Sequence, residues 1–215
     1  MFPESGAVEF ADAAARLVLI GRRFDARGWV MGTSGNFSLV LDKEPLRLAI
    51  TKSGTHKGEL TTSDILEVGG EGTSLGVTPG LPSAETRLHI EIVAARPAAA
   101  VLHTHSTWST LMSDRFGSQG GVAIQGYEML KGLAGVATHE HLEWIPVLEN
   151  DQDMERLAAT VRGTLHEYPD CHAFLLRRHG LYTWGATVPE AVRHVEIVEF
   201  LLETVGRKEA APWRS

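Results

Sequence analysis

The chain has 215 residues, a formal net charge of −7 and 43% hydrophobic residues, a composition typical of ordinary globular proteins. The negative charge argues against a general nucleic-acid-binding or anionic-membrane-binding surface, since such a surface needs a basic patch. The sequence has no run of about 18 apolar residues to span a membrane, and its first residues, MFPESGAVEF, lack the pattern of a secretory signal. We therefore expect a cytoplasmic protein with one α/β domain over residues 1–215.

Cysteine and histidine usage points to the kind of site to look for. Cys171 is the only cysteine, so an intrachain disulfide and a cysteine-rich metal site are both excluded. The chain has ten histidines, several of them in pairs or beside glycine. This supply of imidazole indicates metal binding.

Hydrophobic periodicity and turn residues predict alternating helices and strands. In chain order these are a helix over 8–24, a hairpin over 37–50, a strand over 65–68, a helix over 83–96, a strand over 99–102, a helix over 106–112, a short helical segment within 126–132, a strand over 144–147, a helix over 151–166, strands over 173–176 and 181–184, and a helix over 187–205. Ser83 is predicted to cap its helix, and Thr187 and Glu190 have capping-box spacing. Pro146 suggests an edge strand or a strand end.

Three histidines follow apolar strands. His103 and His105 are two positions apart, so on a strand both imidazoles point to the same face. His179 follows a second apolar strand, directly before Gly180. Three neutral imidazoles with an open position are typical of catalytic zinc, while manganese, iron and cobalt suit the ligand set less well and stay open.

A metal that polarises a hydroxyketone still needs a base to take a proton from carbon. Glu85 and Glu128 are the candidates, because each lies in a segment bounded by a helix start or by glycines. Either would otherwise be an ordinary solvated residue.

Small polar residues offer a second kind of site. The loops Gly35–Asn36 and Ser53–Gly54, with Ser83 at a helix start, present backbone N–H groups and hydroxyls that suit a phosphate. Each of them could equally be an ordinary turn.

Five motifs in one order resemble the class II aldolase/adducin family, over about residues 10 to 205. They are GN-S (Gly35, Asn36, Ser38), T-x-SG (Thr51, Ser53, Gly54), S-x-E (Ser83, Glu85), HTH (His103 to His105) and HG (His179, Gly180). The resemblance implies a three-layer α/β/α fold with a central, largely antiparallel sheet. It also implies one zinc ion per subunit, held by His103, His105 and His179, and a homotetramer.

Longer segments, among them ARGWVMGTSGNFS and GYEMLKG, resemble the family's dehydratases of a phosphorylated ketose. There a glutamate removes the proton from C3 and the C4 hydroxyl leaves. Glu128 matches that acid/base position, whereas Glu85 matches the acid/base of the related aldolases; we favour Glu128 and leave the division of labour open. The phosphate contacts that the resemblance implies are Gly35, Asn36, Ser53, Gly54 and Ser83, with Lys57 as an electrostatic candidate.

Two alternatives remain. An aldolase or a 4-epimerase would use the same metal and phosphate sites, but the related aldolases employ a tyrosine near the chain end, and the last tyrosine here is Tyr182. A non-catalytic interaction module, as in adducins, would not need the intact set of three histidines.

Overall fold

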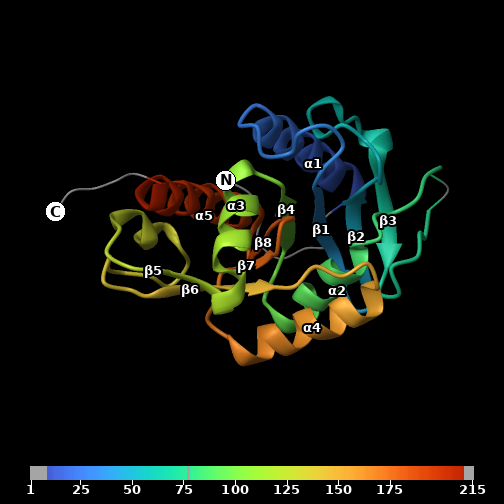
Figure 1. The fold of residues 1–215 in the computed structure, drawn as a ribbon. Helices are drawn as coiled ribbons and strands as arrows, with labels where there is room; N and C mark the ends of the chain where they lie inside the picture. The colour runs from blue at the N-terminus through green and yellow to red at the C-terminus, as the bar shows by residue number, and fades with distance from the viewer. Residues whose placement is uncertain (1–8, 77, 211–215) are drawn as a thin grey trace.

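The computed structural model describes residues 9–76 and 78–210, which form helices packed on both faces of an eight-stranded sheet (Figure 1). The strands are β1 (Asn36–Lys43), β2 (Leu46–Thr51), β3 (Ile65–Gly69), β4 (Ala100–Thr104), β5 (Gly121–Ile124), β6 (Glu143–Leu148), β7 (Ala173–Leu176) and β8 (Gly180–Gly185). The α-helices are α1 (Phe10–Asp25), α2 (Thr86–Ala95), α3 (Thr107–Phe116), α4 (Met154–Glu167) and α5 (Val188–Ala210). Short 3-10 turns are η1 (Lys57–Glu59), η2 (Thr62–Asp64), η3 (Gly117–Gln119) and η4 (Glu128–Gly132).

The sheet has the strand order β3-β2-β1-β4-β8-β7-β6-β5. Every neighbouring pair is antiparallel except β6 and β7, which run parallel. Chain segments far apart in sequence are therefore adjacent at the centre, where β4 lies between β1 and β8. The predicted largely antiparallel sheet is confirmed.

Alternation along the strands produces the three layers. Val101 packs into a core with apolar residues of α2 and α4, whereas Ala100 and Leu102 pack on the other face with α1 and the start of α5. A third cluster joins α3 and the later part of α5 to β5–β8. Figure 1 shows α2 and α4 along the lower side of the sheet and α1 and α5 along the upper side.

Several sequence expectations need correction. Ser83 does not cap α2: the helix begins at Thr86 with Glu85 as its N-cap, because Ser83 closes a separate turn in which its hydroxyl accepts from the Glu85 N–H at 3.2 Å. Pro146 is not on an edge strand, because β5 pairs with the outer side of β6. Hydrophobic periodicity did not predict β5. Val8, the predicted start of the first helix, lies outside the described residues.

The capping box at the last helix is half present. The Glu190 N–H donates to the Thr187 hydroxyl at 3.2 Å, but the Glu190 carboxylate accepts from the Ala186 N–H instead of reaching back to Thr187. The helix extends beyond the predicted end at 205 to Ala210.

No helix in the described part of the chain combines the length and the apolar character that crossing a bilayer requires.

Candidate metal and phosphate site

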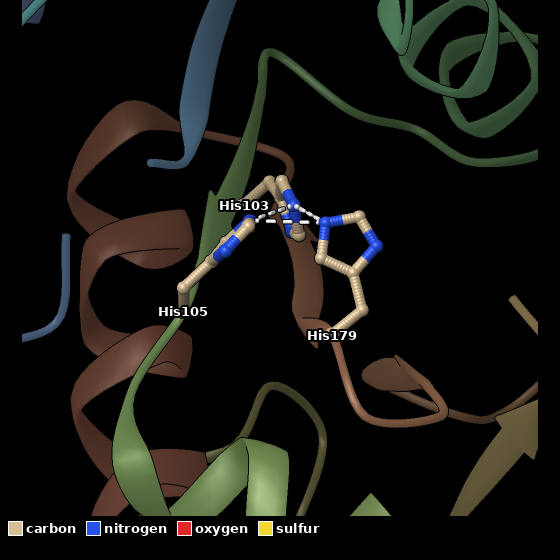
Figure 2. Close-up of side chains that lie close together, drawn as sticks. All are labelled: His103, His105 and His179. Carbon is tan, nitrogen blue, oxygen red and sulfur yellow. Dashed lines mark hydrogen bonds between the residues drawn. The ribbon is translucent and has the colours of Figure 1, made fainter. Parts of the chain in front are cut away.

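Three imidazoles converge at one end of the sheet, where β4 finishes and the turn from β7 to β8 carries His179 (Figure 2). The Nε2 atoms of His103 and His105 lie 2.7 Å apart, those of His105 and His179 3.1 Å, and those of His103 and His179 3.4 Å. Bonds of 2.0–2.1 Å to a tetrahedral zinc would place such nitrogens about 3.3 Å apart. The three histidines that the sequence selected therefore form a triangle of the size that suits one metal ion.

The ring orientations leave these Nε2 lone pairs facing inward. His103 Nδ1 donates to the Leu181 carbonyl at 2.9 Å, which makes Nε2 the unprotonated nitrogen when the ring is neutral. The His103 ring also stacks on Tyr182, with centroids 3.9 Å apart and an interplanar angle of 12°. His179 Nδ1 lies 3.4 Å from Asn150 Oδ1, which favours the same choice of tautomer.

Burial keeps two of the imidazoles in the form that binds metals. Burial and then the neighbouring His179 hold the pKa of His103 well below its ordinary value. Burial and the neighbouring histidines lower the pKa of His105 to about 3. Both rings are therefore neutral at physiological pH, so their lone pairs are available to a cation.

Glu85 is the carboxylate that the structure brings to this triangle. Its Oε1 lies 3.3 Å from His179 Nε2, and its Oε2 lies 3.6 Å from His103 Nε2. Asn36 Nδ2 donates to Glu85 Oε2 at 2.6 Å and to the Ser83 hydroxyl at 3.2 Å. The carboxylate is thereby directed at the same point as the imidazoles.

Asn36 is itself oriented by a buried histidine that the sequence reasoning missed. His89 Nε2 lies 2.5 Å from Asn36 Oδ1, and its Nδ1 lies 2.7 Å from the Ser38 hydroxyl. Because burial lowers the pKa of His89 to about 4, the ring is neutral, donates from Nε2 and accepts from Ser38. This chain of hydrogen bonds fixes which end of the Asn36 amide faces Glu85.

A cavity of about 180 Å³ opens beside Glu85 and His105. Its lining includes all six residues for which the sequence predicted phosphate contacts: Gly35, Asn36, Ser53, Gly54, Lys57 and Ser83. The structure therefore gathers residues from four separate segments around one small polar space.

Lys57 is the buried cation of this cavity. Its ammonium donates to the carbonyls of Thr33 at 3.0 Å and Thr55 at 2.7 Å. Burial lowers the pKa of Lys57 to about 8, against the opposing effect of the Glu85 charge. An ammonium has three donors, so one more is available to an anion in the cavity.

Glu128 lies elsewhere on the molecule. It begins η4, its side chain is 73% exposed, and it pairs with Lys131 at 2.7 Å. β5, which leads to Glu128, runs antiparallel to β6 and so finishes at the end of the sheet opposite His179. Within one described chain, Glu128 does not line the cavity beside the histidines.

Arg178, next to His179, faces away from the cavity: its side chain is 69% exposed and donates to Asp114 at 2.8 Å. Its backbone has φ of 56°, in the left-handed region, and its N–H donates to the Ser113 hydroxyl at 2.9 Å. The strained turn presents His179 to the triangle.

A buried carboxyl braces the strand end from the other face of the sheet. Between His103 and His105, the Thr104 side chain points toward α5 and donates to Glu199 Oε1 at 2.8 Å. Ser106 donates to Glu199 Oε2 at 2.5 Å. Glu199 is 3% exposed, and burial raises its pKa to about 7.

The Glu199→Gln substitution should flatten the pH dependence of stability in the metal-free protein. Because the folded-state pKa of about 7 exceeds the ordinary value of 4.5, the folded chain binds the extra proton. Stability is therefore retained below pH 4.5 and lost as the pH rises toward 7, by at most roughly 3 kcal/mol. Urea unfolding at pH 5 and pH 8 measures the difference; an equal pH dependence in the glutamine variant would contradict it.

Gly180 lies where no side chain fits. A Cβ atom there would lie 2.1 Å from the Thr104 carbonyl oxygen and 3.1 Å from the His103 ring. β4 and β8 pair at this point, so any larger residue must push the two strands apart.

We therefore expect Gly180→Ala to destabilise the fold by about 1–3 kcal/mol, as overpacking does, and to weaken metal binding. The matched control is Gly163→Ala in α4, where a Cβ meets nothing within 4 Å. Removing a helical glycine should stabilise by about 0.5–1 kcal/mol. Urea denaturation and metal titration of both variants test this, and a Gly180 variant as stable as the unaltered chain would refute it.

Comparison with known proteins identifies the family. The family model described as the class II aldolase and adducin N-terminal domain matches residues 15–205. The chain belongs to the class II aldolase/adducin family. A curated methylthioribulose-1-phosphate dehydratase of Methylococcus capsulatus is 48% identical over 200 residues, 93% of this chain and 95% of that protein. One from Sorangium cellulosum is 42% identical, covering 90% and 91%.

Solved class II aldolases share the architecture. The L-fuculose-1-phosphate aldolase from Thermus thermophilus matches with a TM-score of 0.73 and 25% identity, over 94% of this chain and 97% of that one. The L-fuculose 1-phosphate aldolase from Glaciozyma antarctica has a TM-score of 0.72 at 22% identity, covering 99% and 80%, and supports the fold alone. The family resemblance predicted from the five motifs is confirmed.

Proposed function

We propose that this class II aldolase family member is a methylthioribulose-1-phosphate dehydratase of methionine salvage. It converts 5-methylthioribulose 1-phosphate to 2,3-diketo-5-methylthiopentyl 1-phosphate. Relatives with that name are 42–48% identical over at least 90% of both chains. The observation that carries the proposal is the small polar cavity directly beside the triangle of histidines and Glu85.

The proposed cofactor is one zinc ion per subunit on His103, His105 and His179. The donor set fits zinc. Three unprotonated imidazole nitrogens lie within 3.4 Å of one another and face inward, and a cation between them would relieve the repulsion of their lone pairs. When bound, zinc would supply Lewis-acid polarisation of the ketose oxygens. His103 and His179, held by Leu181 and Asn150, keep the ligand nitrogens pointing inward.

The cavity residues would hold the phosphate of the substrate. The Gly35–Asn36 and Ser53–Gly54 loops and Ser83 line the space, and Lys57 adds a charge that is shielded from water. Binding the phosphate here fixes the distance from the reacting carbons to the histidine triangle, so the carbon chain of the sugar extends toward Glu85 and His105.

The elimination needs a base for the C3 proton and a proton for the departing C4 hydroxyl. The C3–H and C4–O bonds break, water leaves, and the resulting enol tautomerises to the diketone. We assign the proton transfer to Glu128, acting on the site of a second copy in the proposed homotetramer, since it faces solvent in its own chain. The Lys131 hydrogen bond holds the pKa of Glu128 below its usual range, which keeps it in the basic form.

Glu85 would then orient the reacting end of the site. Its carboxylate is held by Asn36 and faces His179 and His103 at 3.3 and 3.6 Å. It remains the second candidate for the acid/base role, as in the sequence prediction.

The decisive assay incubates the zinc-loaded protein with 5-methylthioribulose 1-phosphate and follows the products by mass spectrometry. We expect loss of one water, abolished by a chelator and restored by zinc. Cleavage of the carbon chain would identify an aldolase, and a product of unchanged mass an epimerase. A folded, zinc-loaded protein that leaves this substrate intact would refute the proposed substrate.

A further inference from the structure

A second cluster of metal-ligating side chains lies at the other end of β7. Glu143 begins β6 and His172 directly precedes β7; because these strands are parallel, both residues lie at their starting end. His141 joins them from the loop before β6, and one ligand atom from each of the three lies within 4.8 Å of the others. His179 follows the finishing end of β7, so the two clusters occupy opposite ends of one short strand.

The distances in this cluster suit a bound ion. Glu143 Oε2 lies 2.9 Å from His141 Nε2 and 3.0 Å from His172 Nδ1. These separations are close to those in the first triangle of histidines. They are also close to the distance between two ligand atoms of a tetrahedral zinc ion, about 3.3 Å. Two imidazoles and one carboxylate are a ligand set that divalent transition metals accept.

The groups behind the ligands hold them in the orientation that a metal needs. His172 Nε2 donates to the Ala134 carbonyl at 2.8 Å, which leaves Nδ1 directed at the cluster. The His172 backbone N–H donates to Glu143 Oε1 at 3.1 Å, and the His172 ring Nδ1 lies 3.1 Å from Oε1 and 3.0 Å from Oε2, whereas His141 Nε2 faces Oε2. Histidines that bind metals commonly donate their second ring nitrogen to a backbone carbonyl in this way.

Charge and access also favour a cation here. The Glu143 side chain is only 1% exposed, and the side chains that contact its carboxylate in the described chain are His141 and His172. His141 is 31% exposed and lines an open cavity of about 450 Å³ together with His172, Cys171 and His194. The carboxylate is therefore buried and directed at two imidazoles, and those imidazoles border the cavity from which an ion would enter.

We propose that His141, Glu143 and His172 form a second divalent-metal site, of the zinc class, separate from the first triangle. Its protein ligands leave at least one coordination position open to the cavity. The site would join the loop before β6 to the start of β7, since one ligand comes from the loop and the other two come from the strand starts.

The metal would also fasten the segment that carries Glu128. His172 holds the Ala134 carbonyl, and the Ala134 N–H donates to His194 Nε2 at 3.1 Å. Both backbone groups of Ala134 are thus bound by histidines at this cavity, between η4 and His141. Filling the site should slow hydrogen exchange over residues 133–142.

The test removes the first site and counts what remains. We would prepare His105→Ala/His179→Ala, confirm its fold by circular dichroism, and measure bound metal after equilibration with zinc and, separately, with Co²⁺. We expect about one equivalent of zinc and visible d–d absorption with Co²⁺. The absorption should report mixed nitrogen and oxygen ligands. This readout does not depend on the substrate or on the proposed activity.

Adding His141→Ala to that background should weaken metal binding at least ~10-fold, since loss of even an outer-shell partner lowers metal affinity by that much. Glu143→Gln, which keeps the hydrogen-bonding shape, is the second variant in case the first perturbs the loop. His166→Ala, an exposed histidine on α4, is the matched control and should bind metal unchanged. The proposal is overturned if the background variant retains no metal equivalent, or if its metal survives both cluster substitutions.

Discussion

His179→Ala is expected to release one metal equivalent per chain and to abolish turnover. The substitution removes one corner of the histidine triangle, and His103 and His105 alone give a two-ligand site. Loss of an outer-shell partner already costs about 10–100-fold in metal affinity, so loss of a ligand should cost at least ~100-fold. Metal analysis after dialysis and the dehydration assay measure both effects.

The design separates this effect from unfolding. His179 lies in the turn between β7 and β8 and its side chain is 18% exposed, so alanine leaves no large internal void. The exposed His166→Ala variant controls for the loss of an imidazole in general. Full metal content and full activity in folded His179→Ala protein would exclude His179 as a ligand.

Glu128→Gln should keep its full metal content and lose turnover by about 10²–10⁴-fold, the usual contribution of general acid–base catalysis. Glu128 is not one of the proposed metal ligands, so glutamine removes no ligand. Glu85→Gln is the paired variant. If Glu85 instead transfers the proton, that variant loses turnover and Glu128→Gln retains it.

Mixed oligomers test whether Glu128 acts between subunits. Glu128→Gln and His179→Ala chains, each inactive alone, would be co-expressed with different tags and purified as hybrids. A site built from the histidines of one chain and Glu128 of another is intact with a probability of one half times one half, so about a quarter of sites should regain activity. If Glu128 acts within its own chain, no site contains both intact groups and the hybrids stay inactive.

The sequence predicted the histidine triangle for a physical reason. Strand alternation places His103 on one face and Thr104 on the other, and His105 returns to the first face even though β4 ends at Thr104. His179 could be selected because it also follows an apolar strand. Local periodicity is sufficient for such inferences because each depends on only a few adjacent residues.

The supporting residues could not be predicted in this way. Glu199 is 95 residues from Thr104 in sequence, and His89 is 53 residues from Asn36. The helix that carries His89 was predicted from its apolar residues alone. The burial of His89 depends on tertiary packing, which that periodicity does not reveal. Glu143 and His172 meet only because β6 and β7 pair in parallel, and the sequence contains no local signal for that pairing.

The stack of rings at the centre of the sheet has a consequence for the entropy of metal binding. His103 lies on Tyr182, which lies in turn on Phe174 with centroids 4.9 Å apart, and all three side chains are fully buried. The imidazole has therefore lost its rotamer freedom when the chain folds, before any ion arrives. An ion bound at the proposed site would meet one ligand that is already ordered, so no binding free energy would be spent on ordering the His103 ring. His105 and His179, on the loop and the turn, are the proposed ligands whose motion an ion would still have to restrict.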